Sequence, residues 1–221
     1  MAAITAATKI RPSMMTTGIT DTHGRTGPVT MSVMRTMLMQ MFGRPRGVPG
    51  RLGGIIMAHT NADCGAWVTE ILEIGPCDSV LEVGFGPGVI IRRLSKLAAA
   101  RHIAGIDPSQ EMVEQAHARN ATAIKNGRVD LRRGSVEHLP FDDNAFDKAL
   151  AINSMQVWRD SAAGLREMRR VMKPGAGVAL GFTPYSGQQN QGLTQTLTAA
   201  GFTKATVVEK DRWFCALALK P

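Results

Sequence analysis

The chain has 221 residues, 44% of them hydrophobic and 20% charged, which allows one domain with a real core and excludes a disordered chain. Residues 1–60 carry seven Lys or Arg and one acid, a net charge of +6, whereas the remainder carries 19 basic and 17 acidic residues, a net charge of +2. The basic excess therefore lies mostly in the N-terminal region, which argues against a broad nucleic-acid-binding face elsewhere. No apolar run reaches the roughly 18–20 residues that cross a bilayer, and three cysteines far apart predict a cytoplasmic protein without structural zinc.

The N-terminal segment divides into a polar extension and a helical cap. Residues 1–30 are rich in Thr and Ala and lack a continuous apolar stretch, so we expect a disordered extension rather than a secretory signal. The sequence MSVMRTMLMQMF over residues 31–42 places its apolar side chains on one helical stripe, and a glycine-rich basic segment, 43–54, follows. A second amphipathic helix is expected over about 61–73. We predict that residues 31–73 form a lid over an apolar substrate; ordinary core packing of the stripe is the alternative.

Short apolar runs then alternate with helix-length segments. The runs are 80–83, 102–106, 129–132, 148–152, 178–182, 205–208 and 214–219, and the helical segments lie around 88–98, 109–120, 159–172 and 191–200. This alternation predicts right-handed crossovers and a mostly parallel sheet covered on both faces. The link between the last two runs is too short for a crossover. The expected fold is therefore α/β: a Rossmann-like, doubly wound, mostly parallel seven-stranded sheet with an antiparallel C-terminal hairpin and an N-terminal helical lid.

The turn after the first predicted strand holds three glycines at alternate positions. In VLEVGFGPGV, residues 80–89, these are Gly84, Gly86 and Gly88. Glycine permits a positive φ or a close backbone approach, and ligands of parallel sheets bind beyond the carboxyl ends of the strands. The dinucleotide pattern needs a small residue where Val89 stands, and the Walker pattern needs a Gly-Lys-Ser/Thr ending that this turn lacks. The turn thus predicts a ligand site, but one for neither NAD(P) nor ATP phosphates.

Two acidic residues lie at the same predicted edge. Glu82 interrupts the apolar first strand, where a carboxylate needs a cationic ligand group or a hydrogen-bond donor of the protein, such as a backbone N–H. Asp107 ends the second strand, 23 residues after Gly84, close to the offset of about 20 at which an acid binds ribose hydroxyls. Asp107 also fits as the N-cap of the next helix, with Pro108 as its first residue, and one carboxylate has oxygens enough for both roles.

Five motifs in order carry a family resemblance. The third predicted strand precedes GSVEHLPF (134–141), and the fourth runs into FDKALAINSMQVW (146–158). With VLEVGFGPG, GIDPSQEM and VMKPGAGVAL, these resemble the successive motifs of class I S-adenosylmethionine-dependent methyltransferases, over about residues 78–182. Residues 191–219 resemble the closing helix and hairpin of that family. The similarity is to the small-molecule branch that includes ubiquinone/menaquinone C-methyltransferases. It implies S-adenosylmethionine (SAM) as cofactor, S-adenosylhomocysteine as product and a SAM-binding domain over residues 74–221.

The resemblance also implies cofactor contacts. Glu82 and the glycine turn would hold the methionine part of SAM, Asp107 would accept from both ribose hydroxyls, and Asn153 would lie near the sulfonium. Met112 would pack beside the adenine, at whose edge residues 135–137 would lie. Ser135 stands where Asp is common in the family, and its hydroxyl accepts with less charge assistance. The implied cofactor-binding residues are Glu82, Gly84, Phe85, Gly86, Gly88, Asp107, Pro108, Met112, Ser135, Val136, Glu137 and Asn153.

The acceptor side is less defined by sequence. SAM brings the reactive methyl group, so the protein must chiefly align the reactants and exclude water, and we assign no catalytic base and no metal. His59, Trp158 and Tyr185 are the candidate residues of the substrate pocket, each with an ordinary packing or surface role as alternative. The Asn/Asp-Pro-Pro-aromatic and Pro-Cys motifs of DNA base methylation are missing after the fourth strand. We expect a small, apolar organic or lipid-like acceptor.

Two other functions stay open. One is methylation of RNA or protein, with the substrate bound by the basic segment over residues 43–54, which contains Arg44, Arg46 and Arg51. The other is a cofactor-binding module without catalysis. The sequence predicts no membrane span, leaves surface association with a membrane open, and does not define the oligomeric state.

Overall fold

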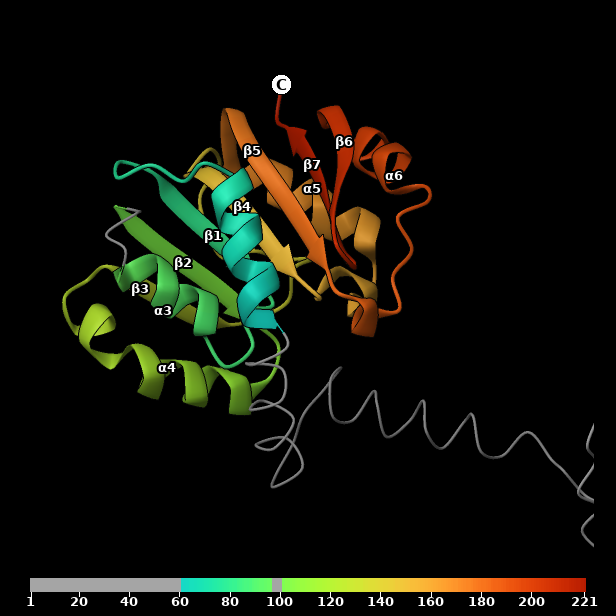
Figure 1. The fold of residues 1–221 in the computed structure, drawn as a ribbon. Coiled ribbons are helices and arrows are strands. Elements are labelled where there is room, and N and C mark those ends of the chain that lie inside the picture. The colour runs from blue at the N-terminus through green and yellow to red at the C-terminus, as the bar shows by residue number, and fades with distance from the viewer. Residues whose placement is uncertain (1–60, 97–100) are drawn as a thin grey trace, which may run out of the picture.

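The computed structural model describes residues 61–96 and 101–221, in which helices cover both faces of one seven-stranded sheet (Figure 1). The strands are β1 (Ser79–Val83), β2 (His102–Asp107), β3 (Val129–Arg133), β4 (Phe146–Ile152), β5 (Met172–Phe182), β6 (Thr203–Lys210) and β7 (Trp213–Leu219). Their order across the sheet is β3-β2-β1-β4-β5-β7-β6. The first five strands pair in parallel, and β7 is antiparallel to both of its neighbours, β5 and β6. The predicted sheet and its C-terminal hairpin are confirmed.

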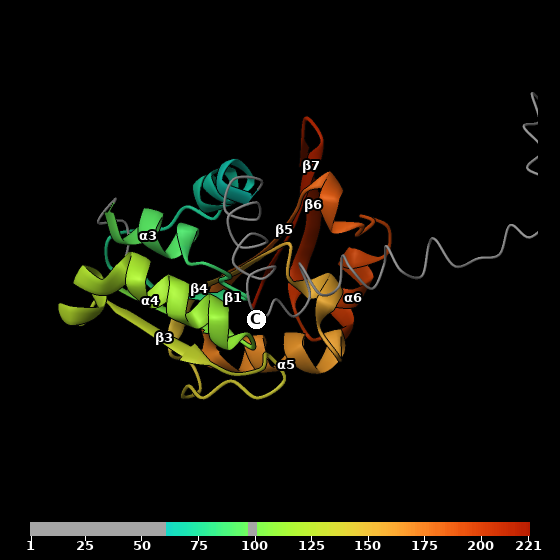
Figure 2. The ribbon, with the colours of Figure 1, turned by 90° about the horizontal axis from the view of Figure 1, so that it is seen from below.

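The helices form two layers that belong to two separate apolar clusters. The helices are one over residues 61–71, α3 (Val89–Lys96), α4 (Gln110–Lys125), α5 (Ser161–Val171) and α6 (Leu193–Ala199). Two 3-10 turns, η2 (Met155–Val157) and η3 (Pro184–Ser186), accompany them. The helix over 61–71, α3 and α4 bury side chains such as Val68 and Ile91 against one face of the sheet. On the other face, α5 and α6 bury Leu165 and Leu197. Figure 2 shows the helix over 61–71 and α5 on opposite sides of the strands.

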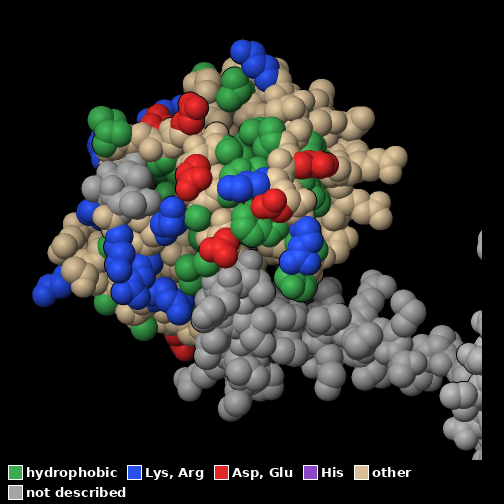
Figure 3. All heavy atoms as spheres, in the orientation of Figure 1, with side chains coloured by type: hydrophobic (Ala, Val, Ile, Leu, Met, Phe, Trp, Pro, Cys, Tyr) green, Lys and Arg blue, Asp and Glu red, His purple; other side chains and the backbone are tan. Residues whose placement is uncertain are grey.

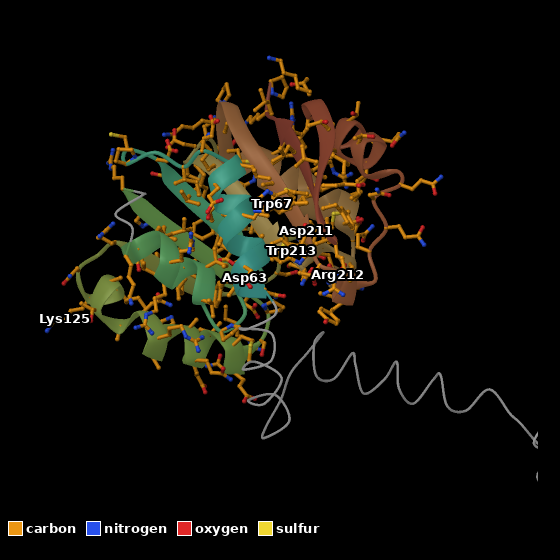
Figure 4. All side chains as sticks on the ribbon, viewed as in Figure 1. Asp63, Trp67, Lys125, Asp211, Arg212 and Trp213 are labelled. Carbon is orange, nitrogen blue, oxygen red and sulfur yellow. The ribbon has the colours of Figure 1, made fainter. Side chains whose placement is uncertain are left out.

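The helix over residues 61–71 lies beside the β6–β7 hairpin. The rings of Trp67, on this helix, and Trp213, at the start of β7, are 6.3 Å apart between centroids. Figure 4 shows both near Asp211 of the hairpin turn, whereas Lys125 lies away from them at the outer end of α4. The helix ends two residues earlier than predicted, because Glu73 adopts a positive φ of 50°. Conversely, α4 continues five residues beyond its predicted end, to Lys125, shortly before Gly127 at φ 70°.

The described part of the chain leaves several expectations untested. Residues 1–60, with the expected extension, most of the predicted lid and His59, lie outside the described residues. Within 61–96 and 101–221 no helix is both long enough and apolar enough to cross a bilayer. Cys64, Cys77 and Cys215 are all free thiols.

Candidate functional site

The strand order reverses beside β1, where a ligand-binding crevice is expected. β2 and β3 lie on one side of β1, and β4 and β5 lie on the other. In open parallel sheets, loops that leave in opposite directions open a crevice at the carboxyl ends of such strands. The segments that follow β1, β2, β3, β4 and β5 therefore meet at the lower edge of the sheet in Figure 1.

The glycine turn after β1 requires glycine for reasons internal to the protein. Gly84, Gly86 and Gly88 have φ values of 72°, 52° and 75°, which L-residues with side chains rarely adopt. A Cβ on Gly84 would lie 2.1 Å from the Ser154 Oγ, and one on Gly88 would lie 2.7 Å from the Ala116 Cβ. The turn therefore packs directly on α4 and on the segment after β4, which fixes the direction of its backbone N–H groups.

Asp107 joins the glycine turn to the end of β2. Its side chain is buried, and its two oxygens accept from the Gly86 N–H and the Ser109 N–H, each at 2.9 Å. The helix-cap interpretation is wrong: α4 begins at Gln110, and Ser109 is its N-cap, because the Ser109 hydroxyl accepts from the Met112 N–H. Burial raises the pKa of Asp107 to about 6, against the effect of the two N–H donors. Each oxygen keeps a second lone pair for a ligand hydroxyl.

Glu82 is a buried carboxyl group with one unsatisfied oxygen. It is 2% exposed, and its Oε2 has no hydrogen-bond partner among the described residues. Burial and then the nearby charge of Asp107 raise the pKa of Glu82 to about 8, opposed by the backbone N–H of Ile91 in the first turn of α3. The sequence predicted either a backbone N–H or a cationic ligand group as the partner of Glu82. A backbone N–H does bind the carboxyl group, and the second oxygen still lacks a donor. Such an orphaned oxygen fits a hydrogen-bonding or cationic ligand group.

The residues expected at the adenine have partners within the protein. The Ser135 hydroxyl donates to Glu137, whose other oxygen accepts from the backbone N–H groups of Arg159 and Asp160 at 3.1 Å. Glu137 thereby ties the loop after β3 to the segment before α5. The side chain of Val136 lies in the apolar cluster under α5.

Phe85 and Met112 are buried as well. A Cβ on Gly105 would lie 2.6 Å from the Phe85 ring, so this ring packs over the middle of β2 and belongs to the core. Met112 lies in the first turn of α4 and is 2% exposed. Adenine contacts of Met112 and of residues 135–137 stay predictions.

Asn153 connects three elements at the carboxyl edge. It has φ 46°, and its Nδ2 donates to the Asn61 Oδ1 at 2.7 Å and to the Thr183 Oγ1 at 2.8 Å. Its Oδ1 accepts from the Thr183 N–H at 2.8 Å. Neither Asn61 nor Thr183 is among the site residues predicted from the sequence. Thr183 could have been found as the residue directly after the fifth strand, but no local signal marks Asn61.

Of the candidate pocket residues, Trp158 and Tyr185 lie within the described part of the chain. Trp158 is half-buried, and its indole N–H donates to the Ser154 Oγ at 2.8 Å, beside the glycine turn. Tyr185 is 76% exposed on η3. Among residues 61–96 and 101–221, no group of three or more His, Cys, Asp or Glu side chains is placed to hold a metal ion.

The comparisons with known proteins agree with one another, because each of them finds methyltransferases. Residues 80–175 match a family described as "Methyltransferase domain". An uncharacterized methyltransferase of Bacillus subtilis, YdaC, is 31% identical over 182 residues, which is 77% of this chain and 98% of that protein. The ubiquinone/menaquinone biosynthesis C-methyltransferase UbiE of Geotalea daltonii is 32% identical over 110 residues, 49% of this chain and 47% of that protein. The crystal structure of a SAM-dependent methyltransferase from Aquifex aeolicus superimposes with a TM-score of 0.64 at 22% identity, over 71% of this chain and 89% of that one.

Proposed function

Since the chain belongs to the class I SAM-dependent methyltransferase superfamily, we propose that it transfers a methyl group from SAM to a small organic acceptor. The observation that carries the proposal is the unsatisfied Oε2 of Glu82, buried beside a glycine turn at the switch point of the sheet. A carboxylate so placed needs a donor, and the ammonium group of the methionine part of SAM is one.

The residues of this chain fit the rest of the cofactor. Asp107 has a free lone pair on each oxygen for ribose hydroxyls, and its bonds to Gly86 and Ser109 keep the carboxylate in place. Met112 and residues 135–137 would lie along the adenine, with Ser135 and Glu137 held by their mutual hydrogen bond. When bound, SAM supplies an electrophilic methyl group, so the protein has only to position the acceptor and exclude water.

We place the acceptor at the carboxyl ends of β4 and β5 and the lid over it. The helix over residues 61–71 begins at this edge, because Asn61 contacts Asn153 there. Residues 31–60 precede that contact directly and are the segment we propose as a lid. Partial similarity to UbiE and the half-buried ring of Trp158 support an acceptor with an apolar, organic body.

A second candidate function is methylation of an anionic macromolecule such as RNA. Lys and Arg side chains gather over α3 and α4 (Figure 3). Arg119 donates to the Pro87 carbonyl of the glycine turn, and burial together with the charge of Arg92 lowers the pKa of Arg119. The last turn of α3 adds Arg93 and Lys96. Two neighbouring arginines favour an anion, and steep salt dependence of substrate binding would identify this alternative.

The test begins with the cofactor. Calorimetry and thermal shift should detect SAM and S-adenosylhomocysteine at roughly micromolar affinity, with NAD as the control. Binding of NAD with no response to either SAM compound would refute the proposal. Labelled methyl transfer from SAM into cell extract, fractionated into lipid, small-molecule, RNA and protein pools, then identifies the acceptor class. Label confined to the RNA or protein pool would favour the second candidate, and cofactor binding without any label would favour a module without catalysis.

A further inference from the structure

A cavity of about 360 Å³ opens at the carboxyl edge of the sheet, on the α5 side. One wall is the segment after β4, residues 155–161, and the other is the segment after β5, residues 188–196. Since β4 and β5 are neighbours, the two segments face each other across the ends of these strands.

The lining of this cavity combines a small apolar surface with amides and one charge. Met155, Trp158 and Leu193 supply the apolar part. Gln156, Gln188 and Gln191 supply three side-chain amides, and Arg159 is the only charged residue among the described residues of the lining. This lining suits a ligand that is apolar at one end and polar, with negative charge, at the other.

Gln156 carries an unsatisfied acceptor. Its Nε2 donates to the Asn153 carbonyl at 2.8 Å, which fixes the orientation of the amide. Its Oε1 is shielded from solvent and has no hydrogen-bond partner among the described residues. A buried carbonyl oxygen without a donor is unfavourable, and Gln156 lines the cavity, so a ligand that lets this amide turn its Oε1 toward an N–H or O–H would remove that cost.

The cavity is joined to the glycine turn by two side chains. Trp158, in the cavity wall, donates to the Ser154 Oγ at 2.8 Å. Ser154 in turn packs against Gly84, since a Cβ on that glycine would lie 2.1 Å from the same oxygen. The wall of the cavity is thus in contact with the turn that we propose for the methionine part of SAM.

We propose that this cavity binds the acceptor and selects a small amphipathic molecule with an aromatic or aliphatic body, a hydroxyl or N–H donor, and a carboxylate. The inference rests on the proposed function and narrows the class of acceptor: the molecule carries an anionic group in addition to the expected apolar body. The Gln156 Oε1 accepts from the hydroxyl or N–H, the guanidinium of Arg159 pairs with the carboxylate, and Trp158 contacts the body.

Three probes that share one ring test the selection. 4-Hydroxyphenylacetate is anionic, 4-hydroxyphenylacetamide is neutral and tyramine is cationic. Binding of each to the full chain is measured by NMR titration with saturating S-adenosylhomocysteine, and the side-chain amide signal of Gln156, assigned by its loss in Gln156→Ala, reports contact at the cavity. We expect 4-hydroxyphenylacetate to bind at least about tenfold tighter than tyramine and to shift this signal.

Variants of two arginines test whether Arg159 causes the preference for the anionic probe. Arg159→Ala should remove the preference for the anion, and Arg159→Lys should keep part of it. Arg166→Ala removes an exposed arginine on α5 that does not line the cavity, and should change nothing. Equal binding of the three probes, no binding of any of them, or an unchanged preference in Arg159→Ala would overturn the inference. If S-adenosylhomocysteine itself does not bind, the proposed function fails, which is measured separately before any probe is added.

Discussion

Glu82 and Asp107 are two buried carboxyl groups on neighbouring parallel strands, and the charge of Asp107 raises the pKa of Glu82. In the register of β1 and β2, Glu82 lies opposite Gly105, two residues before Asp107. Two carboxylates so close in a low-dielectric site disfavour double ionisation. The protein without cofactor therefore holds a proton on Glu82 at neutral pH.

This pair predicts that the protein without cofactor loses stability as the pH rises. Glu82 titrates near pH 8 when folded instead of 4.5, and Asp107 near 6 instead of 3.8. Between the unfolded and folded values the folded state binds more protons than the unfolded state. The free energy of unfolding should therefore fall with rising pH, by about 1.4 kcal/mol per pH unit for each group within its window. Urea unfolding at pH 5.5, 7 and 8.5 measures the slope.

The variant Glu82→Gln tests whether Glu82 causes the fall in the free energy of unfolding at the higher pH values. The amide cannot ionise, so the fall between about pH 6 and 8 should disappear, and SAM affinity should drop because the ammonium loses its carboxylate partner. Glu114→Gln changes an exposed acid on α4 and should keep the wild-type slope. A slope that persists in Glu82→Gln would show that another group titrates there.

Asp107→Ala should weaken SAM binding by about 1.5–3 kcal/mol, through lost charged hydrogen bonds to the ribose. Asp160→Ala is the matched control, because Asp160 caps α5 by accepting from the Ala163 N–H at 2.9 Å. This control should lower the free energy of unfolding by about 1 kcal/mol and leave SAM affinity unchanged. Calorimetry and urea unfolding on both variants separate ligand binding from folding, and wild-type SAM affinity in Asp107→Ala would contradict the ribose assignment.

Gly84→Ala should destabilise the fold by about 3–5 kcal/mol, because the positive φ is strained and the new Cβ overlaps Ser154. Gly127→Ala has nearly the same φ of 70° with nothing within 4 Å, so it should cost only about 1–2 kcal/mol. In a Ser154→Gly background the cost of Gly84→Ala should fall toward that of Gly127→Ala. Equal costs for the two single variants would mean that contact with Ser154 is unimportant.

Removing the N-terminal segment tests the lid. A chain that begins at residue 60 should keep its fold and SAM affinity but lose methyl transfer by about tenfold or more, since nothing then closes the acceptor site. A chain that lacks residues 1–28 should match the full protein in both respects. The measurement is labelled methyl transfer into the acceptor pool of the extract. Full turnover by the shorter chain would assign residues 31–60 to a surface or partner contact instead.

Local signals in the sequence determined most of the sheet and the position of its ligand edge. Runs of apolar residues predicted seven strands because burial on both faces of a parallel sheet leaves no polar alternation. The five residues between the last two runs predicted a hairpin, and three glycines predicted a turn with positive φ. Each of these signals acts within a few residues, where steric limits on the backbone decide the outcome.

Tertiary structure alone decided which groups meet. Insertion of β7 between β5 and β6, the contact of Asn61 with Asn153 and the shielding of the Gln156 Oε1 depend on how distant segments pack. The helix cap shows the limit even at short range. Asp107 and Ser109 are both good cap residues by type, but α4 begins at Gln110 with Ser109 as its N-cap, and the Asp107 carboxylate accepts from Ser109 and from Gly86, 21 residues away. Burial and hydrogen-bond partners are properties of the folded neighbourhood, so residue type and spacing do not determine them.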